Sequence, residues 1–315
     1  MTQIYYLCPD VAEACGGVRV IYRHVDILNA HGFDAQVLHH EPGFRCSWFE
    51  HQTRIAYMPR TVQPDDVLVY PEVFGPDIAE YAPGVRKVVF VQGAYLTFQN
   101  YTFDPNDMRT PYTHPDVLEA MVVSIDTYNY LRYVFPGLKI VRISPSIDPI
   151  LFPLQTEKKK QIAFMSRRNA EDALQVINIL KQRKALNGWT IFPIQHMSQS
   201  EVSAVLQESA IFLSLGTAEG CPLPPMEAMA CGCIVIGYNG RGGREYMRPW
   251  FCRPIKTGDI IEFARMVEKM TRDYEAKPGV AASMGTAASH YIRDHYSPER
   301  EEKGVVGMWK DLLGK

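Results

Sequence analysis

The chain has 315 residues, of which 46% are hydrophobic and 22% are charged, and these proportions exclude a disordered or fibrous protein. Lys and Arg number 33 and Asp and Glu 35, which excludes a nucleic-acid binder that depends on bulk positive charge. The near-neutral net charge of the chain is divided unevenly between its halves. Residues 1–150 carry 11 basic and 17 acidic side chains, whereas residues 151–315 carry 22 basic and 18 acidic ones. The net charges of −6 and +4 indicate that the second half attracts a small anion better than the first.

No apolar run approaches the roughly 20 residues that a bilayer requires, and the first residues lack the pattern of a secretory signal. The seven cysteines, an odd number, do not indicate a disulfide framework. We therefore expect a cytoplasmic protein.

Strands and helices alternate along the first half. Short apolar runs predict strands at residues 4–7, 33–39, 66–70 and 87–91, with later units at 117–124 and 139–143. Residues 18–30 predict a helix that ends at Gly32.

The second half repeats this rhythm. We expect strands at residues 161–165, 189–194, 211–215 and 233–237, and helices at 170–184, 201–209, 224–230, 258–271 and 279–296, with a last helix before residue 313. In the helix at 170–184, Ala173, Leu174, Ile177 and Leu180 are predicted to face inward. The proline-rich segment 144–153 is the expected linker. The pattern predicts an α/β protein with two Rossmann-like parallel-sheet domains facing a cleft. We expect them at residues 1–148 and 149–295, with a C-terminal helix at 296–315 that crosses back to the first domain.

The segment 214–245 has the densest pattern of chemical groups. Glu219 lies in the loop after a strand, and Glu227 follows eight positions later inside the helix that starts near Pro224. The prolines leave few backbone amides at this helix start, among them that of Leu223, and with the helix dipole these amides can bind a phosphate. Gly220 allows a ligand to approach the backbone closely.

Residues 219–232 read E-G-C-P-L-P-P-M-E-A-M-A-C-G. This run resembles the E-x7-E signature of the retaining glycosyltransferases of the GT-B fold, in family four. Three further pieces are similar to that family in order and position: Gly16-Gly17 at a helix start, Arg167 after a strand, and G-G-R-E at 242–245.

The resemblance implies a role for each matching residue of the second half. Glu219 would bind the hydroxyls of the transferred sugar and help to stabilise the reacting centre, and Glu227 would hold the ribose. Arg167 would neutralise the leaving diphosphate. The backbone at Gly220, Cys221 and Leu223 would touch the sugar or diphosphate.

The resemblance also implies that Gly16 and Gly17 lie under the donor's phosphates. The lysine that the family places five or six residues after the clamp arginine is absent, and Arg168 is its expected substitute. Many members carry a histidine that faces the sugar, and this sequence offers Gln92 there, with Tyr95 as a second, weaker acceptor-side candidate.

These features predict a glycosyltransferase that moves a sugar from a nucleotide-diphosphate sugar to an acceptor hydroxyl with retention of configuration. Neither a metal nor another cofactor is expected. The acceptor is a glycan, a lipid-linked sugar or a small molecule, and contact with a membrane surface and the oligomeric state are left open. Because the lysine and histidine are missing, the alternative is a non-catalytic subunit that binds a nucleotide or glycan.

Overall fold

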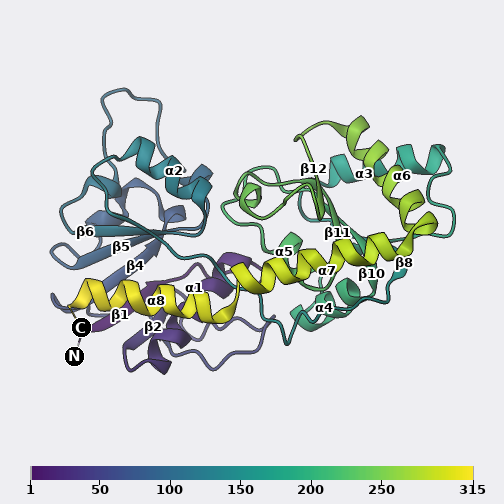
Figure 1. The fold of residues 1–315 in the computed structure, drawn as a ribbon. Helices are drawn as coiled ribbons and strands as arrows, with labels where there is room; N and C mark the ends of the chain where they lie inside the picture. The colour runs from purple at the N-terminus through teal and green to yellow at the C-terminus, as the bar shows by residue number, and fades with distance from the viewer. Residues whose placement is uncertain (1, 315) are drawn as a thin grey trace. The chain divides into compact units, whose positions relative to one another are not determined.

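The computed structural model describes residues 2–314 and divides into two units, Met1–Pro145 with Glu299–Lys315, and Ser146–Pro298. The first unit therefore contains both the N-terminal part of the chain and the last helix. Each unit is built on its own parallel sheet (Figure 1).

The first unit contains a seven-stranded sheet in the order β3-β2-β1-β4-β5-β6-β7. All of its strand pairs are parallel. The strands are β1 (Gln3–Leu7), β2 (Asp34–His39), β3 (Ile55–Tyr57), β4 (Val67–Pro71), β5 (Arg86–Val91), β6 (Val117–Val122) and β7 (Ile140–Arg142). The strand order reverses between β1 and β4, so ligands are expected at the carboxyl ends of these two strands.

Three α-helices accompany this sheet: α1 (Gly16–Ala30), α2 (Ile125–Val134) and α8 (Pro298–Leu313). Short 3-10 turns lie at Glu72–Phe74, Pro76–Glu80, Ala94–Leu96 and Pro111–Thr113. The final helix α8 contacts both the first strand and the first helix: the indole of Trp309 donates a hydrogen bond to the Tyr6 hydroxyl at 3.0 Å, and Arg23 pairs with the buried Glu301. These contacts connect the end of the chain to its beginning.

The second unit contains a five-stranded parallel sheet in the order β12-β11-β10-β8-β9. Its strands are β8 (Lys159–Met165), β9 (Thr190–Ile194), β10 (Ser209–Ser214), β11 (Ile234–Tyr238) and β12 (Cys252–Ile255). Its helices are α3 (Ala170–Gln182), α4 (Gln199–Glu208), α5 (Leu223–Ala230), α6 (Ile260–Ala276) and α7 (Pro278–His295), with a 3-10 turn at Gly242–Glu245. Here the order reverses between β8 and β10.

One predicted core position is wrong. Leu174 was expected to face inward, but its side chain is 61% exposed, whereas Val176 is fully buried in the second unit's core. The buried face of α3 therefore runs through Ala173, Val176, Ile177 and Leu180. Spacings of three and four residues from Ala173 select this face, and Leu174 lies one position outside it.

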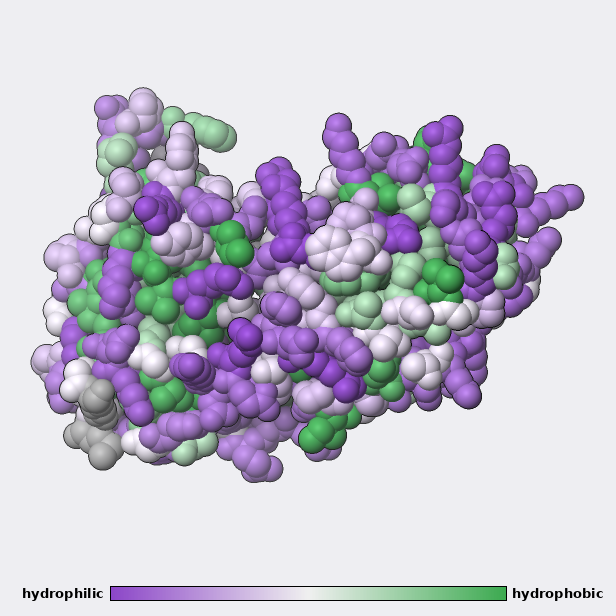
Figure 2. Space-filling model, viewed as in Figure 1, coloured by the Kyte–Doolittle hydropathy of each residue, from purple (hydrophilic) through white to green (hydrophobic). Residues whose placement is uncertain are grey.

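Hydrophobic side chains fill the interior of each unit, and hydrophilic residues predominate on the face drawn in Figure 2. The described residues contain no helix that is both long and apolar enough to span a bilayer.

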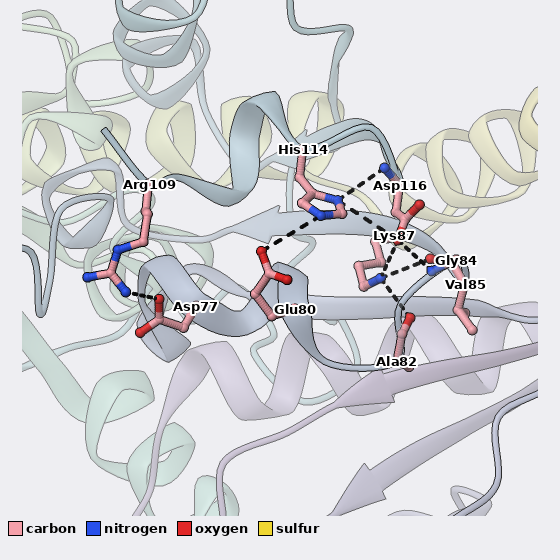
Figure 3. A network of polar contacts seen from close by, with 9 residues as sticks. All are labelled: Asp77, Glu80, Ala82, Gly84, Val85, Lys87, Arg109, His114 and Asp116. Carbon is pink, nitrogen blue, oxygen red and sulfur yellow. Dashed lines mark hydrogen bonds and ion pairs between the residues drawn. The ribbon is translucent and has the colours of Figure 1, made fainter. Parts of the chain in front are cut away.

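A buried lysine fixes the amino ends of β5 and β6. Lys87 is fully buried, and its ammonium group donates hydrogen bonds to the carbonyls of Ala82 and Val85 and to the Asp116 carboxylate (Figure 3). Asp116 also accepts from the amide of Gly84 at 2.8 Å. This network lies at the opposite end of β5 from the loop that carries Gln92.

Candidate functional site

The strand order of the second unit reverses between β8 and β10, and this topological switch point brings two predicted site loops together. Leu213 of β10 pairs with Phe164 of β8, so the two strands end at the same level of the sheet. The loop after β8 carries Arg167, and the loop after β10 carries Glu219. The arginine and the glutamate therefore flank the position where α/β sheets bind ligands.

Glu219 is half-buried, and its carboxylate folds over Gly216, where a side chain would overlap it. Burial raises the pKa of Glu219 above its ordinary value, while the positive charges of Arg168 and, to a smaller extent, Arg167 lower it. The structure thus brings all three charged residues into one electrostatic neighbourhood, and Arg168 has the larger influence on the carboxylate.

Both arginines expose their side chains. Within residues 2–314 neither guanidinium is hydrogen-bonded or ion-paired. Asn169 follows them in the left-handed conformation at φ 52°, and its amide donates to the Asp172 carboxylate at 2.7 Å. Asp172 stands five residues after Arg167, at a position where the resembled family places a lysine. It also accepts from the Tyr238 hydroxyl at 2.7 Å and so supports the loop.

A second loop, after β11, holds the Glu219 loop in place. The amide of Glu219 donates to the carbonyl of Gly240 at 2.8 Å, and the amide of Gly242 donates back to the carbonyl of Glu219 at 3.1 Å. A Cβ on Gly242 would overlap the carbonyl of Gly220. The glycines after β11 are therefore needed for the conformation that presents Glu219.

Helix α5 begins at Leu223, one residue before the predicted start, with Pro222 as its N-cap. The hydroxyl of the buried Tyr246 donates to the carbonyl of Pro222 at 2.7 Å and fixes this helix start. Glu227 lies in the same helix and is only 5% exposed, and Leu223 is also buried, whereas Cys221 is half-buried. The structure thus places the second carboxylate inside the unit, in the middle of α5.

In the first unit, two predicted residues contact each other directly. The Gln92 side chain donates from Nε2 to the carbonyl of Gly17 at 3.0 Å, next to Gly16 at the start of α1. Tyr95 lies three residues further on, and its hydroxyl donates to the Asp126 carboxylate in the first turn of α2 at 2.6 Å.

Sequence reasoning missed Glu72, which directly follows β4. Its side chain is buried and accepts hydrogen bonds from the amides of Gln92, at 3.1 Å, and Gly93, at 2.6 Å. Burial raises the pKa of Glu72 from 4.5 to about 7, although hydrogen bonds from the backbone of Gln92, of Glu72 itself and of Gly93 lower it. The available signal was a lone glutamate at the end of a buried strand, next to the topological switch.

Among the described residues no group of three His, Cys, Asp or Glu side chains is arranged to hold a metal ion. Cys231 and Cys233 are both buried, and burial raises the pKa of each thiol.

The two units and their switch-point loops define an α/β protein of the GT-B fold. The structure is similar over its full length to sucrose-phosphate synthase from Thermosynechococcus elongatus, with a TM-score of 0.72, 12% identity and 100% coverage of both chains. It is also similar to HepE from Anabaena, solved in complex with UDP and glucose, with a TM-score of 0.65, 10% identity and 100% coverage of both chains.

Sequence comparison is more specific for the second unit. Residues 172–287 match the family model of the glycosyl transferases group 1. The chain is 31% identical over 118 residues to an alpha-1,6-glucosyltransferase of Actinobacillus pleuropneumoniae serotype 7, and the match covers 36% of this chain and 36% of that protein. The match thus spans about a third of that relative.

Proposed function

We propose that the protein transfers a sugar from a nucleotide-diphosphate sugar to an acceptor hydroxyl, with retention of anomeric configuration and without a metal or other cofactor. The observation that carries this proposal is the position of Glu219 beside Arg167 and Arg168 at the switch point of the second unit. The two exposed guanidiniums form an anion site next to a carboxylate that can accept sugar hydroxyls.

Breaking a sugar–phosphate bond places negative charge on the departing diphosphate, and preorganised cations stabilise it. Arg167 and Arg168 supply these cations, with the helix start at Cys221 and Leu223 adding backbone donors. Glu219 acts on the sugar, and Glu227 is assigned to the ribose. In the first unit, Gly16 and Gly17 are assigned to the phosphates, and Gln92 and Tyr95 to the acceptor side.

The donor class is supported by HepE, whose structure holds UDP and glucose. We assign a glycan, a lipid-linked sugar or a small molecule as the acceptor, a role in polysaccharide or glycan synthesis, and the cytoplasm as the location. The matches to sugar transferases favour turnover over a subunit that only binds nucleotide or glycan.

The test is transfer from UDP-glucose and GDP-mannose, followed by chromatography of the released nucleotide, with the product anomer read by NMR. Glu219→Gln should lower the transfer rate at least about a hundredfold while the fold persists. The matched control is Glu208→Gln, because Glu208 is exposed and lies just before the amino end of β10, whereas Glu219 follows the carboxyl end of the same strand. Wild-type transfer by the Glu219 variant, or nucleotide binding without any turnover, would refute the proposal.

A further inference from the structure

The carboxylate of Glu72 joins two loops at the switch point of the first unit. Pro71 of β4 pairs with Phe90 of β5, so Glu72 and Gln92 leave the sheet at neighbouring positions. Oε2 of Glu72 accepts from the amide of Gln92, and Oε1 accepts from the amide of Gly93. One buried side chain therefore fixes the first two residues after β5.

The same turn reaches the start of α1. Because its backbone is held by Glu72, Gln92 directs its side chain to the carbonyl of Gly17. The packing is tight. A Cβ on Gly17 would lie 3.3 Å from the side-chain nitrogen Nε2 of Gln92, and a Cβ on Gly93 would lie 3.3 Å from Oε1 of Glu72. The Glu72 carboxylate, the turn after β5 and the glycine loop are thus packed directly against one another.

Few charged groups act on the ionised form of Glu72. Within residues 2–314 it forms no ion pair, and a titratable group that faces it is the phenol of Tyr112, whose pKa is raised by burial and, to a smaller extent, by the charge of Glu72. Its ionised form is therefore held by backbone amides alone. When Glu72 takes up a proton, one oxygen becomes a donor, and an amide of the loop loses an acceptor.

We propose that Glu72 is a positioning residue: its ionised carboxylate sets the loop after β5, and through Gln92 the glycine loop at the start of α1, in the conformation that binds the donor's phosphates. This inference rests on the proposed function, which assigns Gly16 and Gly17 to those phosphates. It follows that donor binding favours ionised Glu72 and releases a proton when the group is protonated in the free protein.

The experiment measures binding of UDP-glucose and GDP-mannose by calorimetry from about pH 6 to about pH 8.5, in buffers of different ionisation enthalpy. In the wild-type protein the dissociation constant of the probe that binds should rise by up to about tenfold as the pH falls from about 8.5 to about 6, with proton release on binding near about pH 7. Glu72→Gln should bind more weakly at about pH 8, with a flatter pH dependence and less proton release.

Two variants separate positioning from folding. Gln92→Leu keeps the backbone amides that Glu72 accepts from but removes the link to Gly17, so it should also lose the pH dependence of binding. Glu50→Gln changes an exposed carboxylate of the same unit and should behave as the wild type. If the Glu72 variant does not fold, the Gln92 variant alone decides.

Wild-type pH profiles in folded Glu72 and Gln92 variants would overturn this inference while leaving the proposed function intact. No binding of either nucleotide sugar at any pH would overturn both.

Discussion

The burial of Glu72 predicts how the free energy of unfolding depends on pH, and this can be tested without a substrate. Because burial raises its pKa from 4.5 in the unfolded chain to about 7, the folded protein binds more protons than the unfolded chain between these values. The free energy of unfolding should therefore fall as the pH rises through this window. The full effect is about 3 kcal/mol, and the part between about pH 5 and about pH 8 is about 2 to 3 kcal/mol.

The perturbation is Glu72→Gln, which removes the titration and keeps the size of the side chain. The assay is urea unfolding followed by circular dichroism at several pH values, analysed as the difference between wild type and variant. Only this difference is informative, because every other titrating group contributes to both proteins. The wild type should lose about 2 to 3 kcal/mol more than the variant between about pH 5 and about pH 8.

Glu50→Gln is the control for charge removal, since Glu50 is exposed and belongs to the same unit. Its unfolding curve should change with pH in parallel with that of the wild type. If the Glu72 variant also runs parallel to the wild type, the carboxylate is not a costly buried charge, and the reasoning is refuted.

Three other predictions follow from the geometry. Gly242→Ala should disturb the Glu219 loop, because the new Cβ would overlap the backbone carbonyl of Gly220, and the transfer rate should fall at least about tenfold. The control is Gly279→Ala, which should leave the rate unchanged because a Cβ there meets no atom within 4 Å. Arg168→Ala should raise the pKa of Glu219, so the acidic limb of the pH–rate profile moves to higher pH; an unmoved limb would contradict this. Lys87→Met should lower the free energy of unfolding by about 3 kcal/mol, because it removes three hydrogen bonds and leaves the Asp116 carboxylate without its cation. Urea titration measures this loss, and a value below about 1 kcal/mol would contradict the prediction.

The regular elements were predictable where the apolar pattern was long. The strand at 4–7 and the helices around 170–184 and 279–296 are present nearly as expected. Strand β3 has only three residues, and β12 reads C-R-P-I, so both were missed because neither forms a continuous apolar run of sufficient length. Leu174 was misplaced because it lies three residues before Ile177, although the buried face runs through Ala173, Val176, Ile177 and Leu180.

The candidate site was predictable from one contiguous motif but not from its supports. Glu219 was named from that motif, and Arg167 was named because the resembled family places an arginine after the corresponding strand. The loop that holds Glu219 comes from beyond β11, and its role depends on the contact between Gly242 and Gly220. Such contacts between loops produce no regular spacing of residues from which they could be predicted.

The two switch points use an acidic residue in different ways. Burial raises the pKa of both Glu72 and Glu219. Glu219 faces Arg167 and Arg168, and these cations can bind a diphosphate beside it. Glu72 faces backbone amides, and no cation pairs with it in the described part of the chain. Because both carboxylate oxygens of Glu72 already accept hydrogen bonds from backbone amides, Glu72 is suited to hold the loops rather than to touch the ligand, while Glu219 is suited to contact the sugar itself.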